Sequence, residues 1–393
     1  MQSIEHELKK LAMSAGADLV GITSRELLSD GPPSADPRYL LESANSVISF
    51  AVSLDMNNAR DFISKKARKP HSDDRRKAVQ RLYRIGDDLA DALRSKGYDA
   101  LQVEVNNNFR PEEGAFDITE MTEFHPEFSH RYAALAAGLG RLGWSGNLLS
   151  PEHGALLELG SVLTSASLEA DSPIPDKDHP CDNCKVCSLV CPVEMIDPKK
   201  SIRVTIAGIT ETIAEKQPHT CCWIGCTGYE GSAASRKWSN WSPYRLEGPL
   251  PREKEEIDAL CIQLQKADPQ MQEDENSFSN YRRAIFDSDA YFNTVCGFCR
   301  NVCFPRREDR LANRSLLLDS GTAALRLDGS YEVAGGDVIE IPTPFEVRAV
   351  ISKGELTEMP GEAPNKPDLF PLDREVVRYI IAHRESLFRE IES

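Results

Sequence analysis

The chain has 393 residues, enough for two or three domains, and its 40% hydrophobic and 27% charged residues are the balance of an ordinary globular protein. A formal net charge of −16 argues against a broad nucleic-acid surface, which needs clustered lysine and arginine, although a local basic patch stays open. The best apolar run, 47–54, has only strand length, and the N-terminal residues lack the apolar core of a signal peptide. We therefore expect a cytoplasmic protein with no membrane partner.

The first hundred residues predict helices and strands in alternation. A helix is expected at 4–15, and strands at 16–23, 47–54 and 98–105. Before the third strand, a long charged helix spans 72–96 and ends at Gly97, which suits a helix C-terminus. Helix, glycine and strand in this order indicate an α/β layer.

The remaining chain is less regular. Residues 106–128 predict a loop, and "SHRYAALAAGLGRLG" (129–143) predicts a helix that enters a Gly-rich turn. A cysteine-rich region begins near Pro173 and is interrupted by an acidic insert at about 231–290. The insert carries a predicted helix at 252–267.

The last part of the chain, 311–393, predicts strands at 330–335 and 344–354 and a helix at 373–392. Within the insert, Trp238 and Trp241 indicate either a flap over a bound group or an aromatic plug. The plug is favoured because aromatic side chains most often supply buried area.

Four cysteines stand in the run Cys181-x2-Cys184-x2-Cys187-x3-Cys191, and Pro192 follows directly. This is the spacing of bacterial ferredoxins. Three thiolates on a tight loop can bind three irons of one [4Fe–4S] cubane, whereas the fourth lies where the chain turns away and binds a second cluster. Zinc, the alternative, prefers two separated C-x2-C pairs.

The fourth cysteine of this run therefore requires further ligands, and Cys296, Cys299 and Cys303 supply three. Asn293 stands where a complete ferredoxin run would have its first cysteine, so one ligand must come from elsewhere. The candidates are Cys221, Cys222, Cys226 and Cys261. Cys261 lies in the predicted helix of the insert, where a cysteine is more typical of a core residue.

Ferredoxin-type crossing of ligands then predicts two [4Fe–4S] clusters. The first would bind Cys181, Cys184, Cys187 and Cys303. The second would bind Cys191, Cys296, Cys299 and one upstream cysteine from the segment "CCWIGCTGYEG".

With these residues assembled, the sequence resembles the corrinoid-dependent iron–sulfur reductases, which are the epoxyqueuosine reductases and reductive dehalogenases. "PPSADPRYLLESANSVISFAVSL" (32–54), "AALAAGLGRLGWSGNLLSPEHGALLELGSVLTS" (133–165) and the cysteine pattern carry the resemblance. In that family an aromatic residue follows the lone upstream cysteine by three positions. Tyr229 follows Cys226 in this way, so the resemblance implies Cys226 as the eighth ligand and Cys222 as the alternative.

The resemblance implies an α/β (α+β), nitroreductase-like domain that holds cobalamin at 1–172. It also implies a ferredoxin-like domain with two [4Fe–4S] clusters at 173–310 and a strand-and-helix extension at 311–393. Electrons would pass from a reduced ferredoxin or flavodoxin through the clusters to cobalamin, which would dehalogenate or deoxygenate a small molecule. Four glycines would approach the corrin edge or simply pack a helix on a strand: Gly138, Gly140, Gly143 and Gly146.

The sequence also departs from the family. Epoxyqueuosine reductases have an aspartate acid before the "AGLG" helix, and "EMTEFHPEFSHRY" has none at the matching place. Glu123, His125 and Tyr132 are the candidate proton donors. The residues beside them that also carry a titratable or cationic group are Glu127, His130 and Arg131.

The helical repeats that help some relatives hold tRNA are not visible after residue 311. Together with the acidic balance, this makes tRNA a less favoured partner than a small molecule. Two alternatives stay open: an epoxyqueuosine reductase that acts on tRNA, and a two-cluster electron-transfer protein with no catalysis of its own.

Overall fold

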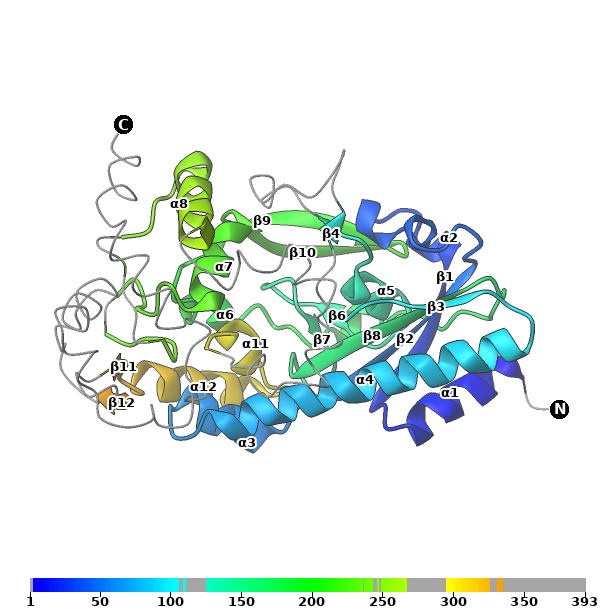
Figure 1. Ribbon diagram of the computed structural model, residues 1–393, viewed down its shortest axis with the longest axis horizontal. Helices are drawn as coiled ribbons and strands as arrows, with labels where there is room; N and C mark the ends of the chain where they lie inside the picture. The colour runs from blue at the N-terminus through cyan, green and yellow to red at the C-terminus, as the bar shows by residue number, and fades with distance from the viewer. Residues whose placement is uncertain are drawn as a thin grey trace.

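The computed structural model describes residues 3–105, 109–110, 125–235, 237–242, 246, 249–266, 295–325 and 331–334 (Figure 1). Its centre is a four-stranded sheet in the order β1-β2-β8-β3, in which every neighbouring pair is antiparallel. These strands are β1 (Leu19–Ser24), β2 (Ser46–Ser53), β3 (Ala100–Gln102) and β8 (Leu157–Thr164). The predicted mixed α/β class is confirmed.

Helices cover both faces of this sheet. On one face lie α1 (Ile4–Ser14) and α4 (Lys69–Ser95), and on the other lies α5 (His130–Ala136) (Figure 1). Along β2, Ile48 and Phe50 belong to the core on the α4 side, whereas Val47 and Ala51 belong to the core on the α5 side. A strand buried on both faces has a continuous apolar sequence, which is what made β2 predictable.

Most of the predicted N-terminal elements are confirmed. The helix expected at 72–96 is α4, and Gly97 follows its end with a φ of +88°. The strand expected at 98–105 is shorter, because only 100–102 pair with β8.

The predicted insert helix is α8 (Lys254–Lys266), and the strand predicted at 330–335 is β12 (Tyr331–Ala334), which pairs with β11 (Thr322–Leu325). The elements predicted beyond residue 335 lie outside the described residues.

The sequence analysis missed a long hairpin formed by β9 (Ile196–Ile206) and β10 (Ile209–Lys216). Its two-residue turn, Ala207 and Gly208, has φ values of +54° and +72°, as the twist of a tight hairpin requires. The Asp30 carboxylate accepts hydrogen bonds from both backbone amides of the turn, at 2.9 and 2.8 Å. The tip of the hairpin is therefore fixed to the N-terminal part of the chain.

The other elements are short or connect these layers. The helices are α2 (Arg25–Leu28), α3 (Met56–Ile63), α6 (Val186–Leu189), α7 (His219–Thr227), α11 (Phe298–Asn301) and α12 (Arg307–Leu318). Two further strand pairs are β4 (Phe109–Arg110) with β5 (His125–Pro126) and β6 (Arg141–Leu142) with β7 (Leu148–Leu149).

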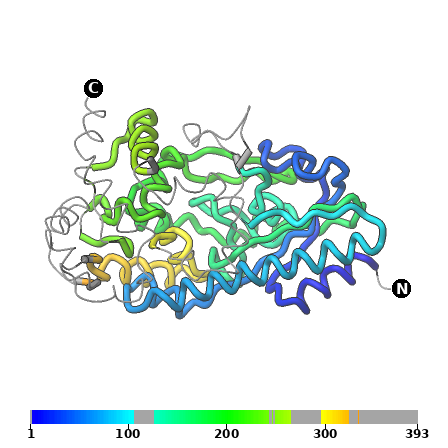
Figure 2. Tube along the Cα trace, viewed as in Figure 1, coloured from blue at the N-terminus to red at the C-terminus, as the bar shows by residue number. Residues whose placement is uncertain are grey.

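Segments that are distant in sequence pack together. Figure 2 shows the yellow segment of α11 and α12 beside the blue segment of α3. Among the described helices, none combines the length and the apolar character that crossing a bilayer requires.

Candidate functional site

The first cysteine group consists of Cys181, Cys184, Cys187 and Cys303, the set predicted for one cluster. Burial raises the pKa of Cys187 to about 12, and the neighbouring thiols of Cys299, Cys181 and Cys184 add to the effect. Burial also raises the pKa of Cys303; Arg310 opposes this, and the thiols of Cys187, Cys181 and Cys184 again add to it. These effects place the four thiols in one neighbourhood, which Cys299 also enters.

The loop of this group is built to turn tightly. Asn183 and Lys185 have φ values of +56° and +57°, so the chain reverses between its first three cysteines. The Asp182 carboxylate accepts a hydrogen bond from the Cys184 amide at 3.2 Å. The spacing of two residues between cysteines suits this turn, because each thiol can then point to the inside of the loop.

The second cysteine group consists of Cys191, Cys222, Cys226, Cys296 and Cys299. Burial raises the pKa of Cys191, and the thiols of Cys222 and Cys299 add to it. On α7, the sulfurs of Cys222 and Cys226 are 3.6 Å apart. The structure therefore brings both candidates for the eighth ligand to the site that the sequence predicted for the second cluster.

The choice of metal rests on the sequence. Within the described residues, no group of three or more His, Cys, Asp or Glu side chains is arranged to hold a single metal ion. The preference for [4Fe–4S] clusters over zinc comes from the ferredoxin spacing of the cysteines and stays a prediction.

The two remaining cysteines have other environments. The Cys221 thiol is buried and donates a hydrogen bond to the Val193 carbonyl at 3.3 Å. Cys261 is 1% exposed in the apolar cluster of α7 and α8, as the sequence pattern predicted for a core residue.

Trp144 belongs to the Gly-rich segment, and its side chain contacts the loop that carries the first cysteines. Its indole nitrogen donates hydrogen bonds to the Asp197 carbonyl at 2.9 Å and the Ser188 hydroxyl at 3.1 Å. Its ring packs in one cluster with Cys187, and Lys185 Nζ lies 4.1 Å from the ring centroid. A cation over an indole face is favourable, so this contact helps to hold the cysteine loop on the N-terminal part.

The four glycines singled out in the sequence lie against atoms of the chain itself. Side chains at Gly138 and Gly140 would collide with the carbonyl oxygens of Ser172 and Leu149. A Cβ at Gly143 would lie 3.4 Å from Cys181 Sγ, which places this glycine beside the first cysteine group. Close packing thus explains Gly138 and Gly140, and contact of the segment with a corrin ring stays a prediction.

The predicted proton donors are only partly described. Glu123 lies outside the described residues, and His125 lies in β5 with its side chain outside them. Tyr132 lies on α5, half-buried against the core on that side of the sheet.

His130, a neighbour of these residues, is held by two hydrogen bonds. Its Nδ1 lies 2.9 Å from the Ser161 hydroxyl, and its Nε2 lies 2.9 Å from the Glu104 carbonyl. Because a carbonyl can only accept, Nε2 carries the proton and Nδ1 accepts. Burial lowers the pKa of His130, so the ring is a neutral structural group.

Two cations beside the second cysteine group were not singled out as a pair in the sequence. Arg131 donates a hydrogen bond to the Gly146 carbonyl at 2.9 Å, and Lys216 Nζ also lies against Gly146. Burial, with the charge of Arg131 adding to its effect, lowers the pKa of Lys216 to about 8, although its side chain is exposed. Arg131 and Lys216 come together only in the folded chain, so no local sequence pattern reveals the pair.

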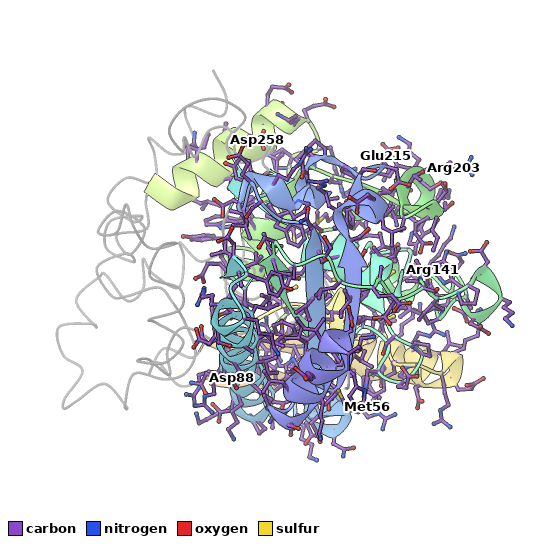
Figure 3. All side chains as sticks on the ribbon, turned by 90° about the vertical axis from the view of Figure 1, so that its right-hand side faces the viewer. Met56, Asp88, Arg141, Arg203, Glu215 and Asp258 are labelled. Carbon is purple, nitrogen blue, oxygen red and sulfur yellow. The ribbon has the colours of Figure 1, made fainter. Side chains whose placement is uncertain are left out.

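A buried ionic network joins the hairpin to the first cysteine loop. Arg141, 2% exposed, donates to Glu211 Oε1 at 2.6 Å. The other oxygen of Glu211 lies 3.1 Å from His179 Nε2, and His179 Nδ1 accepts from the Cys181 amide at 3.0 Å. Figure 3 shows Arg203 and Glu215 of the hairpin above Arg141. The network was missed because the hairpin was missed.

The insert packs beside cysteines of both groups, because its apolar cluster includes Cys296 and is contacted by Cys184. Trp238 and Trp241 are buried with Phe62 and Phe298, and the Trp241 indole donates to the Phe62 carbonyl at 2.9 Å. The two tryptophans therefore pack the insert as a plug, as predicted.

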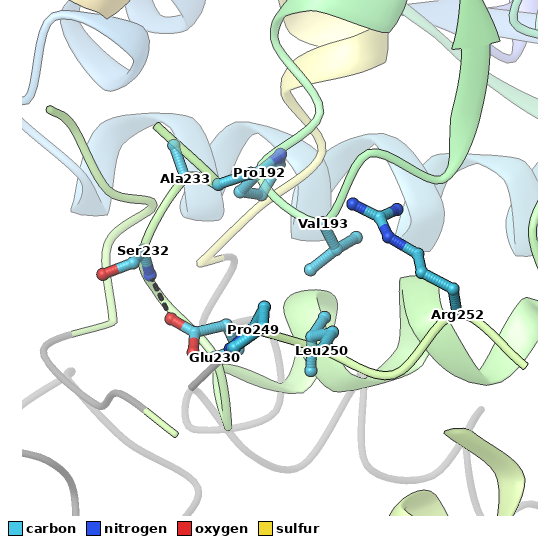
Figure 4. Close-up of a pocket in the computed structure, with 9 residues that line it drawn as sticks. Pro192, Val193, Glu230, Ser232, Ala233, Pro249, Leu250 and Arg252 are labelled. Carbon is cyan, nitrogen blue, oxygen red and sulfur yellow. Dashed lines mark hydrogen bonds between the residues drawn. The ribbon is translucent and has the colours of Figure 1, made fainter. Parts of the chain in front are cut away.

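A pocket of about 180 Å³ lies beside the insert (Figure 4). Pro192 and Val193 line one side of it, and Glu230 and Arg252 provide its charged groups. None of the cysteines lines this pocket, so it is separate from both cysteine groups.

No protein-family model matches the chain. Eight curated proteins do, and all are named epoxyqueuosine reductase. One from Lactococcus garvieae (strain Lg2) is 25% identical over 217 residues, 50% of this chain and 57% of that protein. One from Synechococcus sp. (strain CC9605) is 30% identical over 42% of this chain and 44% of that protein. Another, from Synechococcus sp. (strain RCC307), is 48% identical over 15% of this chain and 18% of that protein.

These matches span between 18% and 57% of the relatives' own length. Among solved structures, an epoxyqueuosine reductase from Streptococcus thermophilus is 13% identical, with a TM-score of 0.38, over 98% of this chain and 100% of that chain. A catabolic reductive dehalogenase is 19% identical, with a TM-score of 0.44, over 85% of this chain and 41% of that chain. The names of the sequence relatives confirm that the chain resembles the epoxyqueuosine reductases.

Proposed function

We propose that the chain is an iron–sulfur reductase that carries two [4Fe–4S] clusters, uses cobalamin and reduces epoxyqueuosine in tRNA. The observation that carries the proposal is the convergence of cysteines from three separate segments, 181–191, 222–226 and 296–303, on two sites beside the Gly-rich segment. The name shared by the eight curated relatives supports the substrate.

In this proposal, residues 1–172 form the nitroreductase-like, cobalamin-binding part and 173–310 form the ferredoxin-like part. Bound cobalamin would supply a strongly reducing cobalt centre. The exposed residues Lys216 and Cys226, next to Arg131 and Gly146, mark the surface where we expect such a group to bind.

The chain's own residues would set the properties of the clusters. The Met195 amide donates a hydrogen bond to Cys191 Sγ at 3.3 Å, and Asn147 Nδ2 lies 3.9 Å from Cys299 Sγ. Hydrogen bonds to ligand sulfurs stabilise the added negative charge of a reduced cluster. Both hydrogen bonds are made to the second cysteine group. A cluster bound there would therefore accept an electron more readily than an equally buried cluster that lacks these hydrogen bonds.

A strain that lacks its own epoxyqueuosine reductase tests the proposal. Expression of this chain should convert the epoxyqueuosine in its tRNA to queuosine, as measured by mass spectrometry of tRNA nucleosides. A Cys181→Ala/Cys191→Ala variant is the control, because it removes one ligand from each cluster. Unconverted tRNA in a strain whose chain carries both clusters and cobalamin would contradict the proposed substrate.

A reductase for a small molecule is the second candidate. The net charge of −16 and the absence of an aspartate in "EMTEFHPEFSHRY" favour it, whereas the relatives' names favour tRNA and so reverse the order that the sequence suggested. Halide release from a halogenated aromatic compound by the reduced, anaerobically reconstituted chain would support it. A chain that binds iron but no cobalamin would instead support the electron-transfer alternative.

A further inference from the structure

The second cysteine group contains one thiol more than a cubane binds. Cys222 and Cys226 are four residues apart on α7, which places both side chains on the same face of the helix. Their sulfurs are 3.6 Å apart, a contact distance at which one thiol can donate a hydrogen bond to the other. One of the two must therefore remain without an iron bond while it touches the sulfur that has one.

Both thiols lie near other members of the group. Cys191 and Cys222 pack against the same apolar cluster, and Cys226 lies within hydrogen-bonding distance of Cys296. Position therefore does not single out either residue as the ligand.

The neighbouring Cys221 shows what a fixed structural thiol looks like. It is 3% exposed, and its S–H group is occupied by the Val193 carbonyl. The thiols of Cys222 and Cys226, in contrast, are described in contact with each other and not with a backbone carbonyl.

We propose that Cys222 and Cys226 are interchangeable ligands of the second cluster. One thiolate would bind iron, and the other thiol would donate an S–H···S hydrogen bond to the bound sulfur. In an exchange, the incoming thiol would give its proton to the departing thiolate, so that one Fe–S bond forms as another breaks and no electron is transferred. This inference rests on the proposed two-cluster function.

The arrangement has a consequence for electron flow. A hydrogen bond to a ligand sulfur stabilises the reduced cluster, so the spare thiol holds the reduction potential of the second cluster above the value it would have with a single thiol. Loss of either cysteine should therefore lower that potential without removing the cluster.

The test compares four anaerobically reconstituted variants with the wild type: Cys222→Ala, Cys226→Ala, the double variant and Cys221→Ala. The wild type should bind about eight iron atoms per chain, four for each cluster. Each single variant should keep about eight, with the EPR signal of the second cluster appearing at a lower potential. The double variant should lose the second cluster but keep about four iron atoms and the signal of the first, which also shows that it folds. Cys221→Ala should match the wild type.

Two results would overturn the inference. If one single variant loses the second cluster and the other matches the wild type, that cluster has one fixed ligand. If the double variant keeps both clusters, neither cysteine is a ligand. A wild type that binds far fewer than eight iron atoms under conditions that reconstitute ferredoxins would instead refute the proposed function, and the ligand pair with it.

Discussion

Glu158 on β8 joins the sheet to the second cysteine group, and its replacement by glutamine should destabilise the protein. Its carboxylate accepts from Arg75 of α4 at 2.8 Å and from Arg300, next to Cys299, at 2.6 Å. Burial by itself would raise the pKa of Glu158, but the charges of Arg300 and Arg75 outweigh it and lower the pKa to about 2. Glu158→Gln would leave two half-buried arginines without the buried carboxylate that they share.

The magnitude follows from the pKa. A change from the ordinary value of 4.5 to about 2 corresponds to about 3 kcal/mol at 1.36 kcal/mol per unit. This agrees with the roughly 3–5 kcal/mol expected when one partner of a buried ion pair is removed. Because the folded-state pKa is depressed, this stability is complete above pH 4.5 and is lost only as the pH falls towards about 2.

Urea unfolding of the iron-loaded protein, followed by far-UV circular dichroism, measures the effect. Glu158→Gln should lower the free energy of unfolding by about 3 kcal/mol, equally at pH 6 and pH 8, since the carboxylate is ionised at both. Glu152→Gln, an equal charge change at an exposed position, should have almost no effect. If both variants lose less than about 1 kcal/mol, the ion pair does not stabilise the fold and the reasoning fails.

Three further predictions concern buried groups. Burial lowers the pKa of His71 to about 3, so between pH 6.5 and pH 5 only the unfolded state takes up a proton on this residue. His71→Leu should therefore reduce the loss in free energy of unfolding over that range by up to about 1.4 kcal/mol per pH unit. Parallel pH profiles of the free energy of unfolding for the two proteins would contradict this. Gly154 has a φ of +58°, and a Cβ there would strike the carbonyl of Cys303, so Gly154→Ala should reduce the amount of bound iron. Gly97→Ala, at a positive φ but in open space, should lower the free energy of unfolding by only about 1–2 kcal/mol and leave the iron content unchanged. Arg141→Met leaves Glu211 buried without its cation and should cost about 3–5 kcal/mol in urea unfolding, and a cost near zero would show that the network is dispensable.

The sequence predicted those elements whose pattern is local. The helix α4 follows from its charged and apolar periodicity, and β2 follows from an apolar run of strand length. The central strand β8 was missed because Gly160 interrupts "LELGSVLT" and hides its strand character. The structure explains this glycine, since a side chain there would strike the ring of Phe50 on the neighbouring strand.

The hairpin of β9 and β10 could have been found. Residues 202–206 alternate between apolar and polar before Ala207–Gly208, but the buried Glu211 breaks the pattern after the turn, and this pair is a weaker turn signal than Asn-Gly. The carboxylate of Asp30, far away in sequence, compensates by binding both turn amides. Long-range support of this kind has no local signature.

The site residues also differ in how far the sequence predicts them. Seven cysteines were predicted as cluster ligands from their ferredoxin spacing, and they stay a prediction. The choice between Cys222 and Cys226 does not follow from the spacing, since both lie on one face of a helix that the sequence analysis had not placed. Lys216 and the partners of Glu211 come together only through the hairpin, so their roles needed the folded chain.

The carbonyl of Cys303, which accepts from the Ala155 amide at 2.8 Å, has a consequence for any attempt to divide this protein. The next residue, Phe304, is fully buried in the core between the sheet and α4, although it comes from the far end of the cysteine region. A fragment that ends near residue 172 would expose the surface that Phe304 covers, and a fragment that begins there would expose Phe304. The cysteine-rich part is therefore not an independent module that could be exchanged between proteins, and a shift of the backbone at Cys303 would disturb the packing of the neighbouring sheet.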